Sequence, residues 1–265
     1  ARTRIEDLEA RWSRFREDSE ISVLNRHGFA RVSPDTEDLV ARSISGWRRT
    51  GGRFDPTVYG SMMGLGYSCT FERIGAAELG RPPEAAPGCA AIEVAAGTVR
   101  LPSGAGFDPG GIGKGLAADI VAAELLERGA EGAVVSLGGD VCAAGRSETG
   151  AWVIRIEEPL AGISATVAFA EGAVATSTPL RRTWTQSGTA RHHLVDPGRG
   201  LPYGDGAPTL VSVVAAEAWW AEVCTKAAMS LPRQLVGGML EEAAALVAYR
   251  DGSVEMINGM ERYLR

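Results

Sequence analysis

The sequence predicts an α+β fold of helices and β-sheets. Two observations support this prediction: short β-rich runs follow one another in series through the second half of the chain, and helical patterns are grouped between them. Regular alternation of one strand with one helix would instead indicate a doubly wound parallel sheet. Because the 265 residues contain no repeat of fixed period and no long linker, we expect one domain over residues 1–265.

Apolar periodicity and capping residues predict two helices in the first part of the chain. The first should end near Asp18 and is marked by four apolar residues at helical spacing: Ile5, Leu8, Trp12 and Phe15. Ser33 followed by Pro34 is typical of a helix start, and the glycine pair at residues 51–52 is expected to end that second helix.

Later elements are predicted from apolar runs between turn residues. A helix over residues 114–128 should end at Gly129, and two more helices are expected over residues 218–230 and 232–244. Residues 80–88 are rich in proline and alanine and predict a surface loop. Strands and hairpins are expected at residues 92–101, 133–137, 152–156, 163–169, 174–176, 183–195, 210–214, 245–249 and 254–257.

The composition narrows the classes of function. With 27 basic and 33 acidic residues the formal charge is −6, which argues against a nucleic-acid partner. The four cysteines are far apart and form no C-x-x-C pair, so neither a zinc site nor a disulfide framework is indicated. No apolar run reaches the roughly 18 residues of a transmembrane segment, and no signal peptide is visible, which leaves the localisation open.

The most informative motif is a glycine-rich segment at residues 107–115, FDPGGIGKG. Glycines permit a tight turn whose N–H groups point at one spot, and the helix that follows adds the positive end of its dipole. Together with Lys114, such a turn suits a phosphate group. It is neither a Walker sequence nor a G-x-G-x-x-G dinucleotide motif. A purely structural connection before a helix is the alternative.

Three further groups of residues are candidates for chemistry. The corner at residues 138–140, Gly-Gly-Asp, puts an acid beside exposed backbone, although an ordinary turn would look the same. His193 and Asp196 could cooperate in proton transfer or metal binding, because imidazole titrates near neutrality; a structural Asp-Pro-Gly turn is the alternative. Glu222 and Lys226 lie four residues apart on a predicted helix, and the simplest interpretation is a surface ion pair.

Taken together, these segments resemble the ApbE-like flavin transferase family, the FAD:protein FMN transferases. Six blocks follow the family's order and extend from Asp18 to about Lys226. They are Ser-Glu-x-Ser-x-x-Asn at residues 19–25, Phe-Asp-x-Thr at 54–57, Asp-x-Gly-Gly-x-x-Lys-Gly at 108–115, Gly-Gly-Asp at 138–140, Ala-Thr-Ser at 175–177 and His-x-x-Asp-Pro at 193–197.

The resemblance implies a fold and an activity. The fold is α+β, with antiparallel sheets and packed helices that enclose an FAD cleft. The activity is a Mg²⁺-dependent cleavage of the FAD pyrophosphate, with transfer of FMN to a Thr or Ser of an acceptor flavoprotein that has an FMN-binding type of domain, and with release of AMP. Two alternatives stay open: an FAD pyrophosphatase, in which water replaces the hydroxyl, and an FAD-binding protein with little turnover.

The resemblance also implies roles for individual residues. His193 would accept the proton of the hydroxyl or orient the pyrophosphate, and Asp196 would be the second catalytic residue. The implied FAD-binding residues are Asn25, Asp108, Gly110, Gly111, Lys114, Gly139, Asp140, Thr176, Ser177 and Arg199. The implied metal ligands are Gly113, Glu222 and Thr225.

The sequence departs from the family at the implied metal site. Glu222 stands where the family has Asp and Lys226 where it has Thr, while Thr225 is displaced by one. A hydroxyl can bind Mg²⁺, but a protonated ammonium has no lone pair to give. Either Thr225 serves with a shifted geometry, or Lys226 places a fixed positive charge where the family places the ion. Thr178 and Arg199 also depart from the family's blocks, and its opening strand with a Met-Gly-Thr segment is not found.

Overall fold

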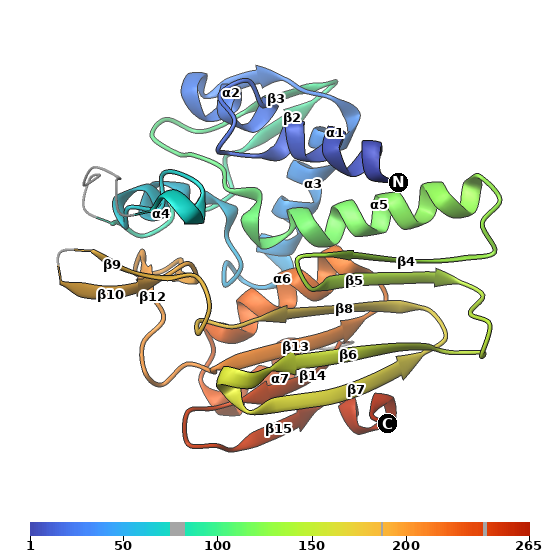
Figure 1. Ribbon diagram of the computed structural model, residues 1–265. Coiled ribbons are helices and arrows are strands. Elements are labelled where there is room, and N and C mark those ends of the chain that lie inside the picture. Colours follow the sequence, from blue (N-terminus) through green and yellow to red (C-terminus); the bar gives the residue numbers. More distant parts are fainter. Residues whose placement is uncertain (75–82, 187, 241–242) are drawn as a thin grey trace. The chain divides into compact units, whose positions relative to one another are not determined.

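A computed structural model, drawn in Figure 1, describes residues 1–74, 83–186, 188–240 and 243–265. The chain forms two compact units. Unit 1 comprises Ala1, residues 112–180 and residues 204–265, and unit 2 comprises residues 2–111 and 181–203. The boundary therefore falls inside the glycine-rich segment. The expectation of one domain over residues 1–265 stays a prediction.

Unit 1 is built on a six-stranded sheet. Its strands are β4 (Gly132–Leu137), β5 (Asp140–Gly145), β8 (Gly172–Ser177), β13 (Leu210–Ala215), β14 (Ala244–Ala248) and β15 (Val254–Ile257). Their spatial order is β15-β14-β13-β8-β5-β4, and every neighbouring pair is antiparallel. Antiparallel strands with helices packed beside them confirm the predicted α+β class.

Helices pack on one face of this sheet and a hairpin covers the other (Figure 1). Helix α5 (Gly113–Glu127) contacts β4 and β5, and helix α6 (Ala218–Met229) contacts β8 and β13. The hairpin consists of β6 (Trp152–Glu158) and β7 (Ile163–Phe169). Its apolar side chains share one core with those of the sheet, including the buried Ile156, Val167, Phe169, Val174, Val214 and Leu246.

The register of the sheet places Asp140 and Ser177 on its helical face. Val141 of β5 lies opposite Val174 of β8, and Val174 belongs to the core beneath the hairpin. Side chains alternate between the two faces along a strand, so Asp140 and Ser177 point the other way, toward α5 and α6. Asp140 of the Gly-Gly-Asp corner and Ser177 of the Ala-Thr-Ser block therefore lie on the face of the sheet that α5 and α6 cover.

Unit 2 contains shorter elements. Its helices are α1 (Arg2–Trp12), α2 (Glu20–His27), α3 (Pro34–Arg49) and α4 (Tyr59–Gly64), with 3₁₀ helices at Pro56–Val58, Phe71–Arg73 and Pro109–Gly111. Strands β1 (Phe29–Arg31), β2 (Glu93–Ala95) and β3 (Thr98–Arg100) form a sheet with β3 in the middle. Two antiparallel pairs follow, β9 (Thr183–Gln186) with β10 (Thr189–His192) and β11 (Val195–Asp196) with β12 (Leu201–Pro202).

The strongest local signals predicted the elements well. Ser33 caps α3, because its hydroxyl accepts the N–H of Thr36 at 3.4 Å. The hairpin at residues 92–101, the helix at 114–128 and the later strands are also confirmed. The first helix ends at Trp12, earlier than expected.

Several elements were not predicted, among them α2 and β5, and one was predicted too long. Helix α2 begins after Ser19, whose hydroxyl accepts the N–H of Ser22 at 3.0 Å, and ends at Gly28 with φ +68°. Strand β5 was missed because its glycine, alanine and cysteine residues carry little β-propensity. The helix expected over residues 232–244 is a 3₁₀ turn, Arg233–Leu235, and the short α7, Val236–Leu240.

Parts of three predictions lie outside the described residues: 80–82 of the expected loop, 187 of the hairpin and 241–242 of the last helix.

Unit 1 also contains 3₁₀ helices at Pro159–Ala161 and Met260–Tyr263. Over the described ranges, none of the helices combines the length and apolarity that crossing a membrane requires.

Candidate functional site

Helices α5 and α6 approach each other closely at Gly115. A Cβ at this position would lie 2.7 Å from the main-chain nitrogen of Trp219 and would overlap the carbonyl of Ala218. A residue with any side chain would therefore push the helices apart, and only glycine permits this approach. The contact brings side chains of each helix within reach of the other helix's first turn.

Each helix caps the N-terminus of the other. Asp119 of α5 accepts hydrogen bonds from the main-chain N–H groups of Ala218 and Trp219, both at 2.9 Å. Glu222 of α6 accepts the N–H of Gly115 through Oε2 at 2.8 Å. The first N–H groups of a helix have no partner within it and carry the positive end of its dipole, so both carboxylates are stabilising there.

Four charged residues, Lys114, Asp140, Glu222 and Lys226, form a cluster that we name the two-lysine centre. Nζ of Lys114 is paired with Oε1 of Glu222 and, at 3.0 Å, with Oδ2 of Asp140. Nζ of Lys226 donates to the same Oε1 of Glu222 at 3.3 Å. The pairing of Glu222 with Lys226 is thus confirmed, but it is not the surface ion pair that its spacing suggested.

The acidic side chains of this centre are buried more deeply than its lysine side chains. The side chains of Glu222 and Asp140 are 0% and 2% exposed, whereas those of Lys114 and Lys226 are 35% and 16% exposed. Lysine carries its charge at the end of a long flexible stem, which allows the charge to reach solvent. The lysine side chains are therefore the part of the centre that solvent reaches.

Ion pairing keeps Lys114 and Glu222 charged in spite of burial. Burial alone would lower the pKa of Lys114, but the attraction of Asp140 and Glu222 raises this pKa above its ordinary value. Burial would raise the pKa of Glu222, but Lys114 and Lys226 hold it below its ordinary value. Burial dominates at Lys226 and lowers its pKa, although Glu222 acts in the opposite direction. At neutral pH the Lys114–Glu222 pair is therefore ionised.

The hydroxyl residues beside the centre bind one another and the protein backbone. Oγ of Ser177 lies 2.7 Å from Oγ1 of Thr225, which donates to the main-chain oxygen of Glu222, also at 2.7 Å. Thr176 donates its N–H to Oδ1 of Asp140 at 3.2 Å. These contacts orient Asp140 and fix the turn of α6 that carries Glu222.

The donor atoms of the centre do not fit Mg²⁺. A divalent cation needs oxygen lone pairs. Oε1 of Glu222 is bound by two ammonium groups, Oε2 is bound by the N–H of Gly115, and the Thr225 hydroxyl is fully buried against Ser177. In the part of the chain that the structure describes, no three His, Cys, Asp or Glu side chains are grouped to hold a metal ion. The assignment of Gly113, Glu222 and Thr225 as metal ligands stays a prediction that these contacts do not support.

The glycine corner between β4 and β5 makes room for Lys114. Gly138 and Gly139 have φ values of +61° and +95°, the region that favours glycine. A Cβ at Gly138 would lie 3.2 Å from Cδ of Lys114. The stem of Lys114 therefore passes over this turn on its way to Asp140.

In unit 2, two side chains hold the first residues of the glycine-rich segment. Asn25 donates its amide to the carbonyl of Phe107 at 2.9 Å and accepts the N–H of Phe107 at 2.7 Å. Asp108 accepts the N–H of Gly110 at 2.8 Å through Oδ1, and its Oδ2 lies 3.0 Å from Nε of Arg14. Both partners of this ion pair are less than 10% exposed.

Arg14 was missed by the sequence analysis. It donates to the carbonyl of Tyr67 at 2.6 Å, and its guanidinium lies over the rings of Phe15 and Tyr67, 4.2 and 4.6 Å from their centroids. In the sequence it stands inside the first predicted helix, among charged residues, and looks solvent-exposed. Only its distant partners, Asp108 and Tyr67, reveal the role.

The histidine segment of unit 2 is organised by a turn. Oδ1 of Asp196 accepts the N–H of Gly198 at 2.9 Å, and its main-chain oxygen accepts the N–H of Arg199 at 3.2 Å. This is the structural alternative for the Asp-Pro-Gly sequence. His193 is half-buried between β10 and β11, while the exposed side chain of Arg199 follows the turn. The catalytic roles of His193 and Asp196 stay predictions.

The predicted site residues fall into one group in each unit. Those of unit 1 are Gly113, Lys114, Gly139, Asp140, Thr176, Ser177, Glu222 and Thr225, and contacts connect all of them except the two glycines. Those of unit 2 are Asn25, Asp108, Gly110, Gly111, His193, Asp196 and Arg199, of which Asp108 contacts Gly110 and Asp196 contacts Arg199.

Two curated proteins are similar in sequence to this chain, and both are named FAD:protein FMN transferase. The protein from Vibrio cholerae is 28% identical over 209 residues, which are 75% of this chain and 62% of the relative. The protein from Klebsiella pneumoniae is 30% identical over 122 residues, which are 45% of this chain and 37% of the relative. The chain thus spans less than two thirds of the length of these relatives.

Solved structures share the fold. The ApbE protein of Thermotoga maritima has a TM-score of 0.86 at 24% identity, over 100% of this chain and 90% of that one. The flavinyl transferase ApbE of Pseudomonas stutzeri has a TM-score of 0.81 at 21% identity, over 99% and 86%. The flavin transferase ApbE of Vibrio cholerae has a TM-score of 0.76 at 23% identity, over 99% and 90%.

The sequence pattern of the ApbE family matches residues 1–249, almost the whole chain. With this match, the resemblance of the six sequence blocks becomes membership, and the chain belongs to the ApbE family.

Proposed function

We propose that this protein transfers FMN from FAD to a Thr or Ser hydroxyl of an acceptor protein and releases AMP. Its family membership and the names of the two curated relatives described above support the proposal. The observation that carries it furthest is the two-lysine centre. Lys114, at the start of α5, is held by two buried carboxylates beside the positive end of a helix, which is an environment suited to a pyrophosphate.

In the proposed reaction the hydroxyl oxygen of the acceptor bonds to the phosphorus of the FMN half of FAD. The bond from this phosphorus to the bridging oxygen breaks, and AMP leaves with that oxygen. The hydroxyl proton passes to His193, which the family resemblance makes the proton acceptor. Lys114 would stabilise the negative charge that develops on the phosphoryl oxygens and on the leaving AMP.

The proposal includes no step through Mg²⁺. The resemblance implies this ion, but Glu222 has both carboxylate oxygens occupied by N–H donors of the protein. Charge stabilisation is therefore assigned to the ammonium groups of the chain itself.

The test is incubation of the purified protein with FAD, Mg²⁺ and an acceptor domain of the FMN-binding type. Covalent flavin fluorescence on the acceptor after denaturing electrophoresis, with one AMP for each flavin bound, is expected. A matched reaction with Lys114→Met should lose most of the transfer. AMP and free FMN without an acceptor would instead indicate the pyrophosphatase. An acceptor that stays free of flavin, with no AMP formed, would exclude both activities.

A second candidate function is FAD binding with little turnover. Lys226 favours it, because a fixed ammonium stands where the family has a metal ligand. In that case FAD would bind with 1:1 stoichiometry in the presence of EDTA, and no AMP would appear on prolonged incubation.

A further inference from the structure

Lys114 and Lys226 are the only lysines in the 265-residue chain, whereas the other 25 of its 27 basic side chains are arginines. These two lysines lie 112 positions apart in the sequence, yet both contact the same oxygen, Oε1 of Glu222. A general need for positive charge would not explain this placement, because arginine serves that need elsewhere in the chain. The site selects for a compact ammonium with three freely directed donors, which the planar guanidinium of arginine does not provide.

The arrangement of charges at this centre suits the binding of an anion. The carboxylates of Asp140 and Glu222 are buried, and their ion pairs with the lysines fix the positions of the two ammonium groups. Among the described residues, Nζ of Lys226 contacts only Glu222, so two of its three N–H donors remain for a ligand. A cation at Oε1 of Glu222 would have to displace two ammonium groups that already contact this oxygen.

We propose that the two-lysine centre binds a diphosphate directly through Lys114 and Lys226, with no divalent cation between protein and ligand. Lys226 supplies from the protein a charge that a bound metal ion would otherwise supply. The inference rests on the proposed function only in taking the diphosphate of FAD as the natural ligand. The centre itself recognises the diphosphate group, so inorganic pyrophosphate is the probe.

The first experiment uses the two lysines as spectroscopic probes. Protein labelled with ¹³C at lysine Cε should give two resonances, which Lys226→Arg assigns by removing one. Titration with inorganic pyrophosphate in EDTA should shift both resonances in a saturable manner. If neither resonance shifts in EDTA, or if only Lys114 responds, the proposal is wrong.

The second experiment tests for a metal site without any phosphate present. Mn²⁺ broadens nearby nuclear resonances, so an ion bound at Glu222 would broaden both lysine signals at substoichiometric amounts. We expect no such selective broadening. Selective broadening that disappears in Glu222→Gln would overturn the proposal, because it would show that the centre accepts a divalent cation.

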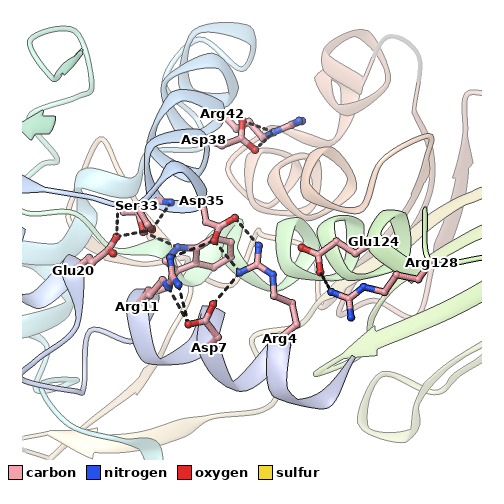
Figure 2. A network of polar contacts seen from close by, with 12 residues as sticks. Arg4, Asp7, Arg11, Glu20, Ser33, Asp35, Asp38, Arg42, Glu124 and Arg128 are labelled. Carbon is pink, nitrogen blue, oxygen red and sulfur yellow. Dashed lines mark hydrogen bonds and ion pairs between the residues drawn. The ribbon is translucent and has the colours of Figure 1, made fainter. Parts of the chain in front are cut away.

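Calorimetry with pyrophosphate in EDTA measures the contribution of Lys226. Lys226→Met should weaken binding by about 10-fold or more, since it removes a charged hydrogen-bond donor to the ligand. Lys226→Arg keeps the charge and should recover part of the affinity. Arg128→Met is the matched control: it removes one positive charge from the C-terminal end of α5, the helix that carries Lys114, where Arg128 pairs with Glu124 at 3.8 Å (Figure 2), and should leave the affinity unchanged. Equal affinities of Lys226→Met and the native protein, with both folded by circular dichroism, would contradict the proposal.

These measurements separate the inference from the proposed function. Pyrophosphate carries no flavin and is not a donor of FMN. Binding of pyrophosphate in EDTA without any flavin transfer would remove the proposed function and leave the inference standing. If the protein transfers flavin but binds pyrophosphate only after Mg²⁺ is added, the proposed function stands and the inference is wrong.

Discussion

Two clusters in this protein have the same charge composition and opposite organisation. The two-lysine centre of unit 1 has two basic and two acidic side chains. So does an arginine network in unit 2, shown in Figure 2, which consists of Arg4, Asp7, Arg11 and Asp35. In the network, basic and acidic side chains are similarly exposed, at 20% to 40%. In the centre, the acidic side chains are buried and the lysine side chains are partly exposed.

The donors differ in the same way. In the network, Arg4 binds both oxygens of Asp35 at 2.7 and 2.8 Å and also reaches Asp7 at 3.0 Å. The N–H donors of the planar guanidinium are thus bound to the carboxylates of the network. At the centre, two ammonium groups share one oxygen of Glu222, and Lys226 contacts no second partner among the described residues. Equal numbers of charges therefore make a network of internal ion pairs in one place and, in the other, the centre that we propose as a binding site.

Loss of the shared carboxylate should have the largest effect. Glu222→Gln leaves two ammonium groups with Asp140 as the remaining acid, and we expect the free energy of unfolding to fall by about 3 kcal/mol or more. Urea denaturation followed by circular dichroism measures it. The matched change in the network, Asp35→Asn, should cost less than about 1 kcal/mol, because its groups are partly solvated. Equal losses would show that burial does not distinguish the two clusters.

The Arg14–Asp108 pair sharpens the comparison, because it is a buried ion pair made by a guanidinium. Arg14→Met should lower the free energy of unfolding by about 3 kcal/mol, since it leaves the Asp108 carboxylate buried without its counter-charge. If Arg14 positions the glycine-rich segment through Asp108, the KM for FAD should rise more than kcat falls, and Arg14→Lys should restore part of it. A loss of stability with unchanged kinetic constants would give Arg14 a purely structural role.

A smaller effect is expected from Arg4→Lys. Lysine keeps the charge but cannot bind both oxygens of Asp35, so the loss should be about 0.5 to 1 kcal/mol. Thermal unfolding at low and high salt checks the assignment, because the native network should weaken as salt is added. A loss as large as that of Glu222→Gln would mean that the shape of the donor matters more than burial.

The smallest effect is a pH dependence of the network. Hydrogen bonding and attraction by Arg4 lower the pKa of Asp35 below its ordinary value, although partial burial opposes this. A lowered pKa in the folded state stabilises the protein above about pH 4, and the contribution is lost as the pH falls through the lowered value. The difference in stability between the native protein and Asp35→Asn should therefore shrink below about pH 4. A difference in stability that grows as the pH falls would contradict this prediction.

Local signals determined much of this protein in advance. The cap at Ser33, the glycine at the end of α5 and the alternating strands each involve residues close in the chain, so their patterns predict the element. The glycine-rich segment and the Gly-Gly-Asp corner likewise singled out Lys114 and Asp140, which the fold brings into contact, while their role in binding stays a prediction. Helix α2 could have been found from Ser19 and Gly28, which follow the same capping rules.

No pattern in the sequence predicted the burial and the spatial partners of Glu222 and Lys226. Their spacing predicted an ion pair, but its burial, its second ammonium from Lys114 and its hydrogen bond to Gly115 depend on residues more than 100 positions away. Burial and charge balance are properties of neighbours in space. They arise only when two helices cross at a glycine and a sheet supplies the remaining carboxylate, because desolvation and Coulomb attraction act over a few ångströms irrespective of sequence separation.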